Sequence, residues 1–91
     1  MSKYLVRVEL HGASYTHYDV LHKSMAAQGF TRKIRDGNGV EYSLPTAEYI
    51  TSTTLDGDIV RQQADSAAAT TGLGRGVLVV EWDRAWWNGL Q

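Results

Sequence analysis

The chain opens with a regular alternation of apolar and polar side chains. In residues 4–10, YLVRVEL, every second position is apolar, which predicts a strand with one buried face. The segment VLVVEW at residues 77–82 is almost wholly apolar and is typical of a strand covered on both faces. These are the two most apolar strand segments, so we expect them to pair at the centre of a sheet.

Two other segments have a helical period. Residues 17–28 carry apolar side chains three or four positions apart, which predicts a helix with Ser14 or Thr16 as its N-cap. A second helix is expected to begin at Asp56 or Asp58, with a valine and several alanines on its apolar side.

The segment between these helices predicts further strands. Residues 30–35 read as a short strand, and the dense turn signal DGNG at residues 36–39 predicts a hairpin. The return segment, residues 40–44, is interrupted by Pro45, as an edge position or a bulge would allow. Residues 47–55 are rich in β-branched side chains and predict a firmer strand.

The element order β-α-β-β-α-β is that of the ferredoxin-like fold. We therefore expect a single α+β domain over residues 1–91, with a four-stranded antiparallel sheet and both helices on one face. The other face would expose Leu5 and part of VLVVEW. Because an exposed apolar face marks a partner surface, we expect a homodimer through this face or through the tail DRAWWNGLQ, which carries two tryptophans.

Composition narrows the function classes. Nine Lys and Arg against ten Asp and Glu give a net charge of −1, which is not the basic excess of a general nucleic-acid binder. The chain has no cysteine, which excludes disulfides, thiol catalysis and cysteine zinc sites. No apolar stretch reaches the ~20 residues of a membrane span. A cytoplasmic protein with no membrane partner is expected.

The three histidines lie within one stretch of the sequence, VELHGASYTHYDVLHK. On a helix His17 and His22 would be about 140° apart, so they do not share a face, and His11 lies in a turn. We therefore predict no histidine metal site. His22, at the rim of the apolar stripe, is a candidate for acid–base work or phosphate contact, or alternatively a half-buried histidine that packs and hydrogen-bonds.

Charged residues supply the other candidates. Glu9 near the end of the first strand would be solvated, or two copies of Glu9 could approach across a dimer and bind a divalent cation. Arg32, Lys33 and Arg35 form the chain's one cluster of positive charge, which would either contact phosphates or protect an edge strand from aggregation. Nearby tyrosines, Tyr42 and Tyr49, could stack on single-stranded bases or belong to the core.

These segments together resemble the antitoxin endoribonucleases of type V toxin–antitoxin systems, which are related in fold to small CRISPR-associated endoribonucleases. The resemblance covers roughly residues 4–82 and rests on the following residues: Tyr4-Leu-Val, Leu21, Met25, Phe30 and Thr53-Thr54-Leu55. It implies cleavage of a single-stranded messenger RNA. The family's acidic position at the end of strand one falls on Glu9, where aspartate is more usual, and a basic helix position falls on His22, with Lys23 beside it.

A non-catalytic function is the alternative. The near-neutral charge favours a dimeric interaction protein, for example a phage-encoded inhibitor of a host defence complex, which would bind a protein partner through its carboxylates or its aromatic tail. The basic strand and the family resemblance favour RNA binding and cleavage, with a divalent cation as an open question.

Overall fold

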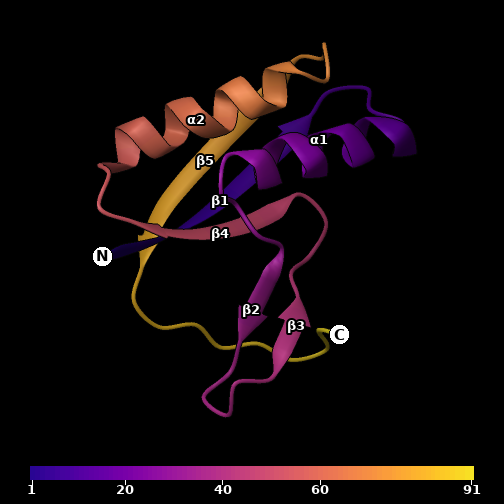
Figure 1. Ribbon diagram of the computed structural model, residues 1–91. Coiled ribbons are helices and arrows are strands. Elements are labelled where there is room, and N and C mark those ends of the chain that lie inside the picture. The colour runs from indigo at the N-terminus through magenta and orange to yellow at the C-terminus, as the bar shows by residue number, and fades with distance from the viewer.

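A computed structural model describes residues 1–91. The elements follow in the order β1 (Ser2–Leu10), α1 (Tyr15–Ala27), β2 (Lys33–Arg35), β3 (Glu41–Ser43), β4 (Glu48–Thr53), α2 (Gly57–Ala69) and β5 (Arg75–Trp82). Both helices lie on one side of the sheet formed by β1, β4 and β5, and the β2–β3 hairpin extends away from it (Figure 1). Neither helix is long and apolar enough to cross a membrane.

The single four-stranded sheet expected from the sequence is wrong. The strands form a three-stranded antiparallel sheet in the order β4-β1-β5 and a separate two-stranded sheet of β2 and β3. Only β1 is central, because β5 pairs with β1 alone and is therefore an edge strand. The apolar run of β5 is not covered on both faces, since Leu78 is 61 % exposed and Val80 is 40 % exposed.

The two sheets separate just after Thr31, where the segment that leads into β2 moves away from the edge of β4. Thr31 and Ile50 exchange two backbone hydrogen bonds of 2.9 and 2.8 Å, and this bridge is the only β-pairing between the segment 30–35 and β4. Beyond it β2 pairs with β3, because Asp36 closes the predicted turn. Its Oδ1 accepts the backbone N–H groups of Asn38 and Val40 at 2.9 and 3.0 Å.

A second turn separates β3 from β4. The carbonyl of Pro45 accepts the N–H of Glu48 at 3.1 Å, and Ala47, the third residue of this turn, has a φ of 69°. Pro45 has no N–H to donate to a strand ladder, so the chain turns here instead of continuing one bulged strand. Residues 40–55 therefore form two strands in two sheets, although the sequence pattern suggested one interrupted strand.

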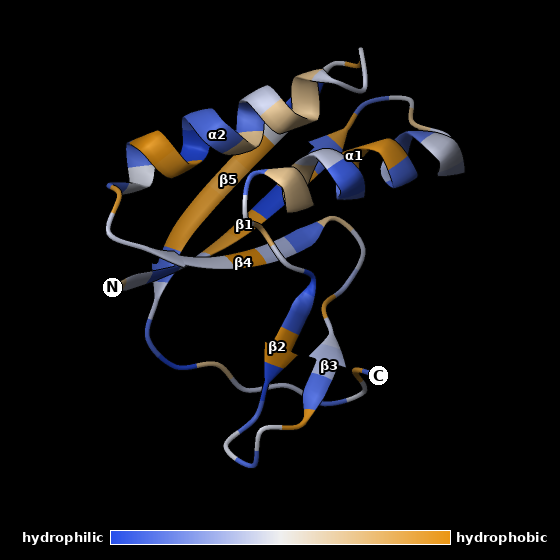
Figure 2. Cartoon of the chain, viewed as in Figure 1, coloured by the Kyte–Doolittle hydropathy of each residue, from blue (hydrophilic) through white to orange (hydrophobic).

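The core fills the space between the helices and the inner face of the three-stranded sheet. Alternate residues of β1 point into it, as the opening pattern predicted, and Figure 2 shows the apolar stretches of β1 and β5 beneath the two helices. Twelve buried residues form one cluster: Tyr4, Val6, Val8, Leu10, Leu21, Met25, Phe30, Tyr49, Val60, Ala64, Ala67 and Ala68. We call the opposite side of this sheet the outer face.

Each helix begins at one of its two predicted caps. Ser14 is the N-cap of α1, and its backbone N–H donates to Nδ1 of His17 at 2.9 Å. Asp56 is the N-cap of α2, and its carboxylate accepts the N–H of Asp58 at 3.3 Å. These contacts satisfy donors that have no partner within the helix.

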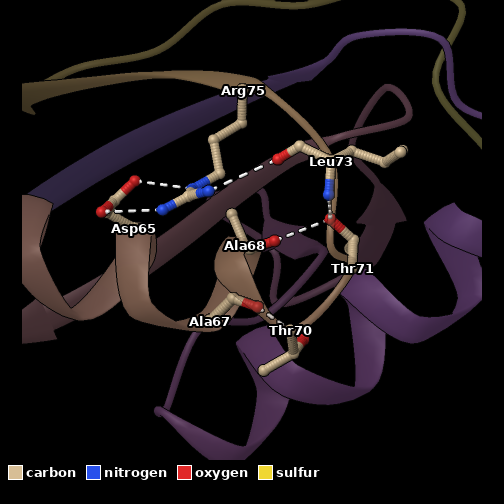
Figure 3. Close-up of polar contacts among 7 residues, drawn as sticks. All are labelled: Asp65, Ala67, Ala68, Thr70, Thr71, Leu73 and Arg75. Carbon is tan, nitrogen blue, oxygen red and sulfur yellow. Dashed lines mark hydrogen bonds and ion pairs between the residues drawn. The ribbon is translucent and has the colours of Figure 1, made fainter.

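An ion pair connects α2 to the start of β5 (Figure 3). The Arg75 guanidinium donates from Nε and Nη2 to the two carboxylate oxygens of Asp65 at 2.8 and 3.3 Å, and from Nη1 to the carbonyl of Leu73 at 3.3 Å. The hydrogen bond from Arg75 lowers the pKa of the Asp65 carboxyl. The contact fixes the direction in which the chain enters the edge strand.

Candidate functional site

The three histidines have three separate sets of neighbours. Nε2 of His11 lies 3.3 Å from Oε1 of Glu9, and His17 caps α1. His22, on α1, lies against Tyr49 of β4, with 2.6 Å between its Nδ1 and the tyrosine Oη. No group of three or more histidine, aspartate or glutamate side chains gathers as metal ligands.

The contact between His22 and Tyr49 fixes the state of the imidazole. Tyr49 is 0 % exposed, and His22 is the only hydrogen-bond partner of its hydroxyl. A buried hydroxyl proton without an acceptor is costly, so the Tyr49 O–H donates to Nδ1. Neutral His22 then carries its proton on Nε2, which makes Nε2 a hydrogen-bond donor.

A permanent cation acts on this pair. Burial lowers the pKa of His22, the positive charge of Arg32 lowers it further, and the carboxylate of Asp19 partly offsets these effects. Burial also raises the pKa of Tyr49, so its hydroxyl stays protonated. Nε of Arg32 is buried and has no hydrogen-bond partner. The imidazole N–H is a donor of the kind that holds a phosphate oxygen, whereas the buried Nε–H of Arg32 is closed to a ligand that arrives from solvent.

Glu9, the other predicted catalytic residue, is not part of this cluster. It alternates with the buried Val8 and Leu10, so its side chain lies on the outer face of the sheet, whereas His22 packs on the inner face. The structure therefore does not bring Glu9 and His22 together. The exposed neighbour of Glu9 is His11.

The predicted RNA-binding residues are also divided. Arg32 lies near His22, and Lys23 is exposed on α1 without a hydrogen bond or ion pair. Lys33 and Arg35 lie on the exposed side of the hairpin. Nζ of Lys33 donates to Oγ of Ser43 at 2.6 Å, and Nε and Nη2 of Arg35 both donate to Oε2 of Glu41 at 3.2 Å.

A groove lies between the hairpin, the edge of β4 and the C-terminal tail, residues 83–91. Two adjoining hollows share the walls Lys3, Arg35 and Trp82, and one of them continues along the tail to Trp86 and Trp87. We call this region the hairpin–tail groove. The tail runs from the end of β5 past β2 and ends close to β3 (Figure 1).

Aromatic rings and cations alternate along this groove. Nζ of Lys3 lies 4.3 Å from the ring centroid of Trp82, and the guanidinium of Arg84 lies 5.0 Å from that of Trp86. Nζ of Lys3 also donates to the carbonyl of Asp83 at 2.8 Å. Trp86 is 76 % exposed, so its ring faces solvent at little benefit to the core.

Two further features complete the lining. Nε1 of Trp82 is buried without a hydrogen-bond partner, and Tyr42 contacts the edge of Trp87 with 5.7 Å between ring centroids. Tyr42 is thus held beside the groove, whereas Tyr49 is a core residue and offers no stacking surface. The charged side chains around the groove are four cations and three carboxylates: Lys3, Lys33, Arg35, Arg84, Asp36, Glu41 and Asp83.

Sequence reasoning missed half of the groove. Lys3 was outside the predicted first strand, and the tail was interpreted as packing or interface. The alternation Trp82-Asp-Arg84-Ala-Trp86 is a signal that could have found it, because every second position carries an aromatic ring or a guanidinium. The pairing of His22 with Tyr49 has no such signal, since it depends on where α1 lies over β4.

No protein-family model matches the chain, and no curated protein matches it.

Proposed function

We propose that this protein binds single-stranded RNA in the hairpin–tail groove. The observation that carries the proposal is the exposed pair of Trp86 and Arg84 on the wall of a groove that also holds Lys3 and Lys33. Single-stranded nucleic acids bind where bases can stack on aromatic rings and phosphates can meet cations. A ring that faces solvent beside a guanidinium supplies both contacts.

The charge of the molecule sets the kind of binding expected. With a net charge of −1, the protein attracts a polyanion only over the short range of the groove. Stacking must then supply much of the affinity, which favours unpaired bases over a duplex. With about three or four phosphate contacts, the logarithm of affinity should fall with the logarithm of salt concentration at a slope of about −2 to −3.

Cleavage of the bound RNA, the activity that the family resemblance implies, is a proposal that rests on His22, which lies outside the hairpin–tail groove, so the RNA strand must extend past the groove to reach it. The Nε2–H of His22 suits a phosphate oxygen on which negative charge develops when a phosphodiester breaks. The Tyr49 contact and the lowered pKa keep the imidazole neutral, and a neutral imidazole is too weak an acid to transfer its remaining proton, so we assign His22 a hydrogen bond that stabilises phosphate charge and no proton transfer.

Fluorescence anisotropy with a labelled single-stranded AU-rich RNA tests binding. Trp86→Ala should weaken binding about 5- to 150-fold, because stacking on one base contributes about 1–3 kcal/mol. Tyr15→Ala is the matched control, since Tyr15 is 84 % exposed on α1, away from the groove. Lys33→Ala should also weaken binding and reduce the salt slope, whereas Arg61→Ala on α2 should not. Equal RNA affinities for all four variants would contradict binding in the hairpin–tail groove.

Cleavage needs its own assay, with and without magnesium. The wild-type protein should shorten the RNA, and His22→Ala, purified in the same way, should bind it with unchanged affinity and leave it intact, because alanine removes the Nε2–H donor. Bound but uncleaved RNA would overturn the catalytic proposal and leave the binding proposal standing. Cleavage that persists in His22→Ala would remove His22 from the mechanism.

The homodimer expected from the sequence remains a proposal, but the proposed interface differs from both surfaces predicted. The tail packs against its own hairpin, where Tyr42 contacts Trp87, and the edge of β5 is unpaired. A protein partner other than a second copy has no specific contact to support it.

A further inference from the structure

The β5 strand has one unpaired edge. The carbonyl of Gly74 accepts the N–H of His11 at 2.8 Å, which fixes the direction of hydrogen bonding along the antiparallel pair. Because this direction alternates, the even-numbered residues of β5 bond to β1 and the odd-numbered residues direct their N–H and C=O groups outward. The outward groups belong to Arg75, Val77, Val79 and Glu81.

This edge has few of the features that protect exposed strands. It contains no proline and no lysine, and its eight residues exceed the length of the other edge strand, β4, which has six. Leu78 and Val80, on the outer face, are among the exposed large apolar residues of the chain. Figure 2 shows the hydrophobic colour along much of this strand.

We propose that two copies of this chain pair through antiparallel β5 strands and form a continuous six-stranded sheet. The twofold axis passes beside Leu78, which lies opposite Leu78 of the second copy. In this register every outward backbone group of one β5 meets a partner on the other. A shift by one residue pair in either direction leaves the groups at one end of each strand unpaired.

The side chains are complementary in the same register. Arg75 lies opposite Glu81 of the second copy, and the twofold axis repeats this pair at the other end of the interface. Glu81 is exposed and has no ion pair within one chain, whereas Arg75 already binds Asp65. Opposite charges at facing positions stabilise antiparallel pairs, and like charges destabilise them. Glu81 would thus gain the partner that it lacks in a single chain.

The apolar positions match as well. Val77 faces Val79 of the second copy on the helix side of the sheet. On the outer face Val80 lies opposite Gly76, which has no side chain to obstruct it. The proposed dimer therefore joins the exposed Leu78 and Val80 of both copies into one apolar strip.

This arrangement also has a consequence for Glu9. Glu9 lies on β1, one strand inward from β5, so three strand spacings of about 4.8 Å separate the two copies. The two carboxylates would be about 14 Å apart or more, too far to share a cation. The dimer proposed here does not create the two-glutamate cation site considered from the sequence.

Single cysteines test the interface, because the wild-type chain has none. Leu78→Cys places two thiols opposite each other in a non-hydrogen-bonded pair, where Cα atoms lie about 4.5 Å apart, within the disulfide range of about 4.4–6.8 Å. Mild oxidation should convert most of this variant into a covalent dimer. Val80→Cys is the matched control, because its two thiols would lie about 13 Å apart along the strands.

Sedimentation of the unmodified protein measures the association itself. The wild type should form dimers at about 100 µM, and Glu81→Lys, which sets a lysine opposite each Arg75, should dissociate at least about tenfold more readily. Ile59→Lys, at an exposed apolar residue of α2, should leave the dimer intact. A monomeric wild type, or a Val80→Cys variant that cross-links faster than Leu78→Cys, would overturn the proposal. The latter result would favour packing between outer faces.

Discussion

The helix-covered sheet and the hairpin with its tail bury their apolar residues to different extents. Twelve buried side chains from β1, β4, both helices and Phe30 form the main cluster. The hairpin contributes the buried residues Ile34 and Leu44, which lie outside that cluster and line a hollow with the tail. The first region has the packing of a folding core, and the second has a thin local contact.

The difference explains why the proposed binding residues lie where they do. The hairpin and the tail are held by the edge contact of Tyr42 with Trp87, the Thr31–Ile50 bridge and a few side chains. Such a region can open at low cost while the core stays folded, as binding surfaces often do. The groove can therefore adapt to a flexible strand of RNA without loss of the sheet.

Leu21→Ala should have the largest effect on stability. Leu21 is 0 % exposed between α1 and the sheet, so the truncation removes buried methyl groups and leaves a cavity. The expected loss is about 2–5 kcal/mol in the free energy of unfolding. Urea denaturation monitored by circular dichroism measures it. A loss below 1 kcal/mol would contradict a core concentrated under the helices.

Ile34→Ala should cost less, about 1–2 kcal/mol, because the hairpin and tail can collapse around the missing atoms. Hydrogen exchange should accelerate in β2, β3 and the tail and stay unchanged in α1. If Ile34→Ala and Leu21→Ala lowered stability equally, the two regions would form one uniformly packed unit.

Tyr49→Phe tests the hydrogen bond that joins α1 to β4 on the core face. Loss of the hydrogen bond to His22 should cost about 1 kcal/mol. It should also raise the pKa of His22, because the tyrosine O–H donates to the neutral imidazole, and nuclear magnetic resonance of the ring protons measures this change. Tyr42→Phe is the control, since its hydroxyl only reaches Asp36 at 3.4 Å.

The sequence predicts the helix-covered region better than the other. Period-two alternation placed β1, and the apolar stripe and cap residues placed both helices, because these signals are local. Residues 30–55 could pair with the main sheet or with each other, and no local sequence pattern decides between these pairings. The DGNG turn favours pairing with β3, and the turn at Pro45 removes β3 from the main sheet. The apolar composition of β5 wrongly predicted a central strand, because an edge strand with an open outer face can have the same composition as a central one.

The candidate site shows the same limit. The local pattern identified His22, Arg32, Lys33 and Arg35, but it could not say that Arg32 would act on His22 while the other two cations faced the groove. The family resemblance implies that Glu9 and His22 belong to one catalytic site. Alternation along β1 instead places Glu9 on the opposite face of the sheet.

Acidification should lower the free energy of unfolding less than the three substitutions do, and His22→Gln should remove this pH dependence. Burial and Arg32 hold the folded pKa of His22 below its ordinary value of 6.5, so the unfolded chain binds a proton more readily than the folded one. The resulting stability is complete above pH 6.5 and is lost as the pH falls through the lowered folded pKa. Between about pH 8 and about pH 5 the wild type should therefore lose more stability than His22→Gln in urea titrations. Parallel curves would mean that His22 is equally solvated in both states, and the hairpin side of the core would then be open to water.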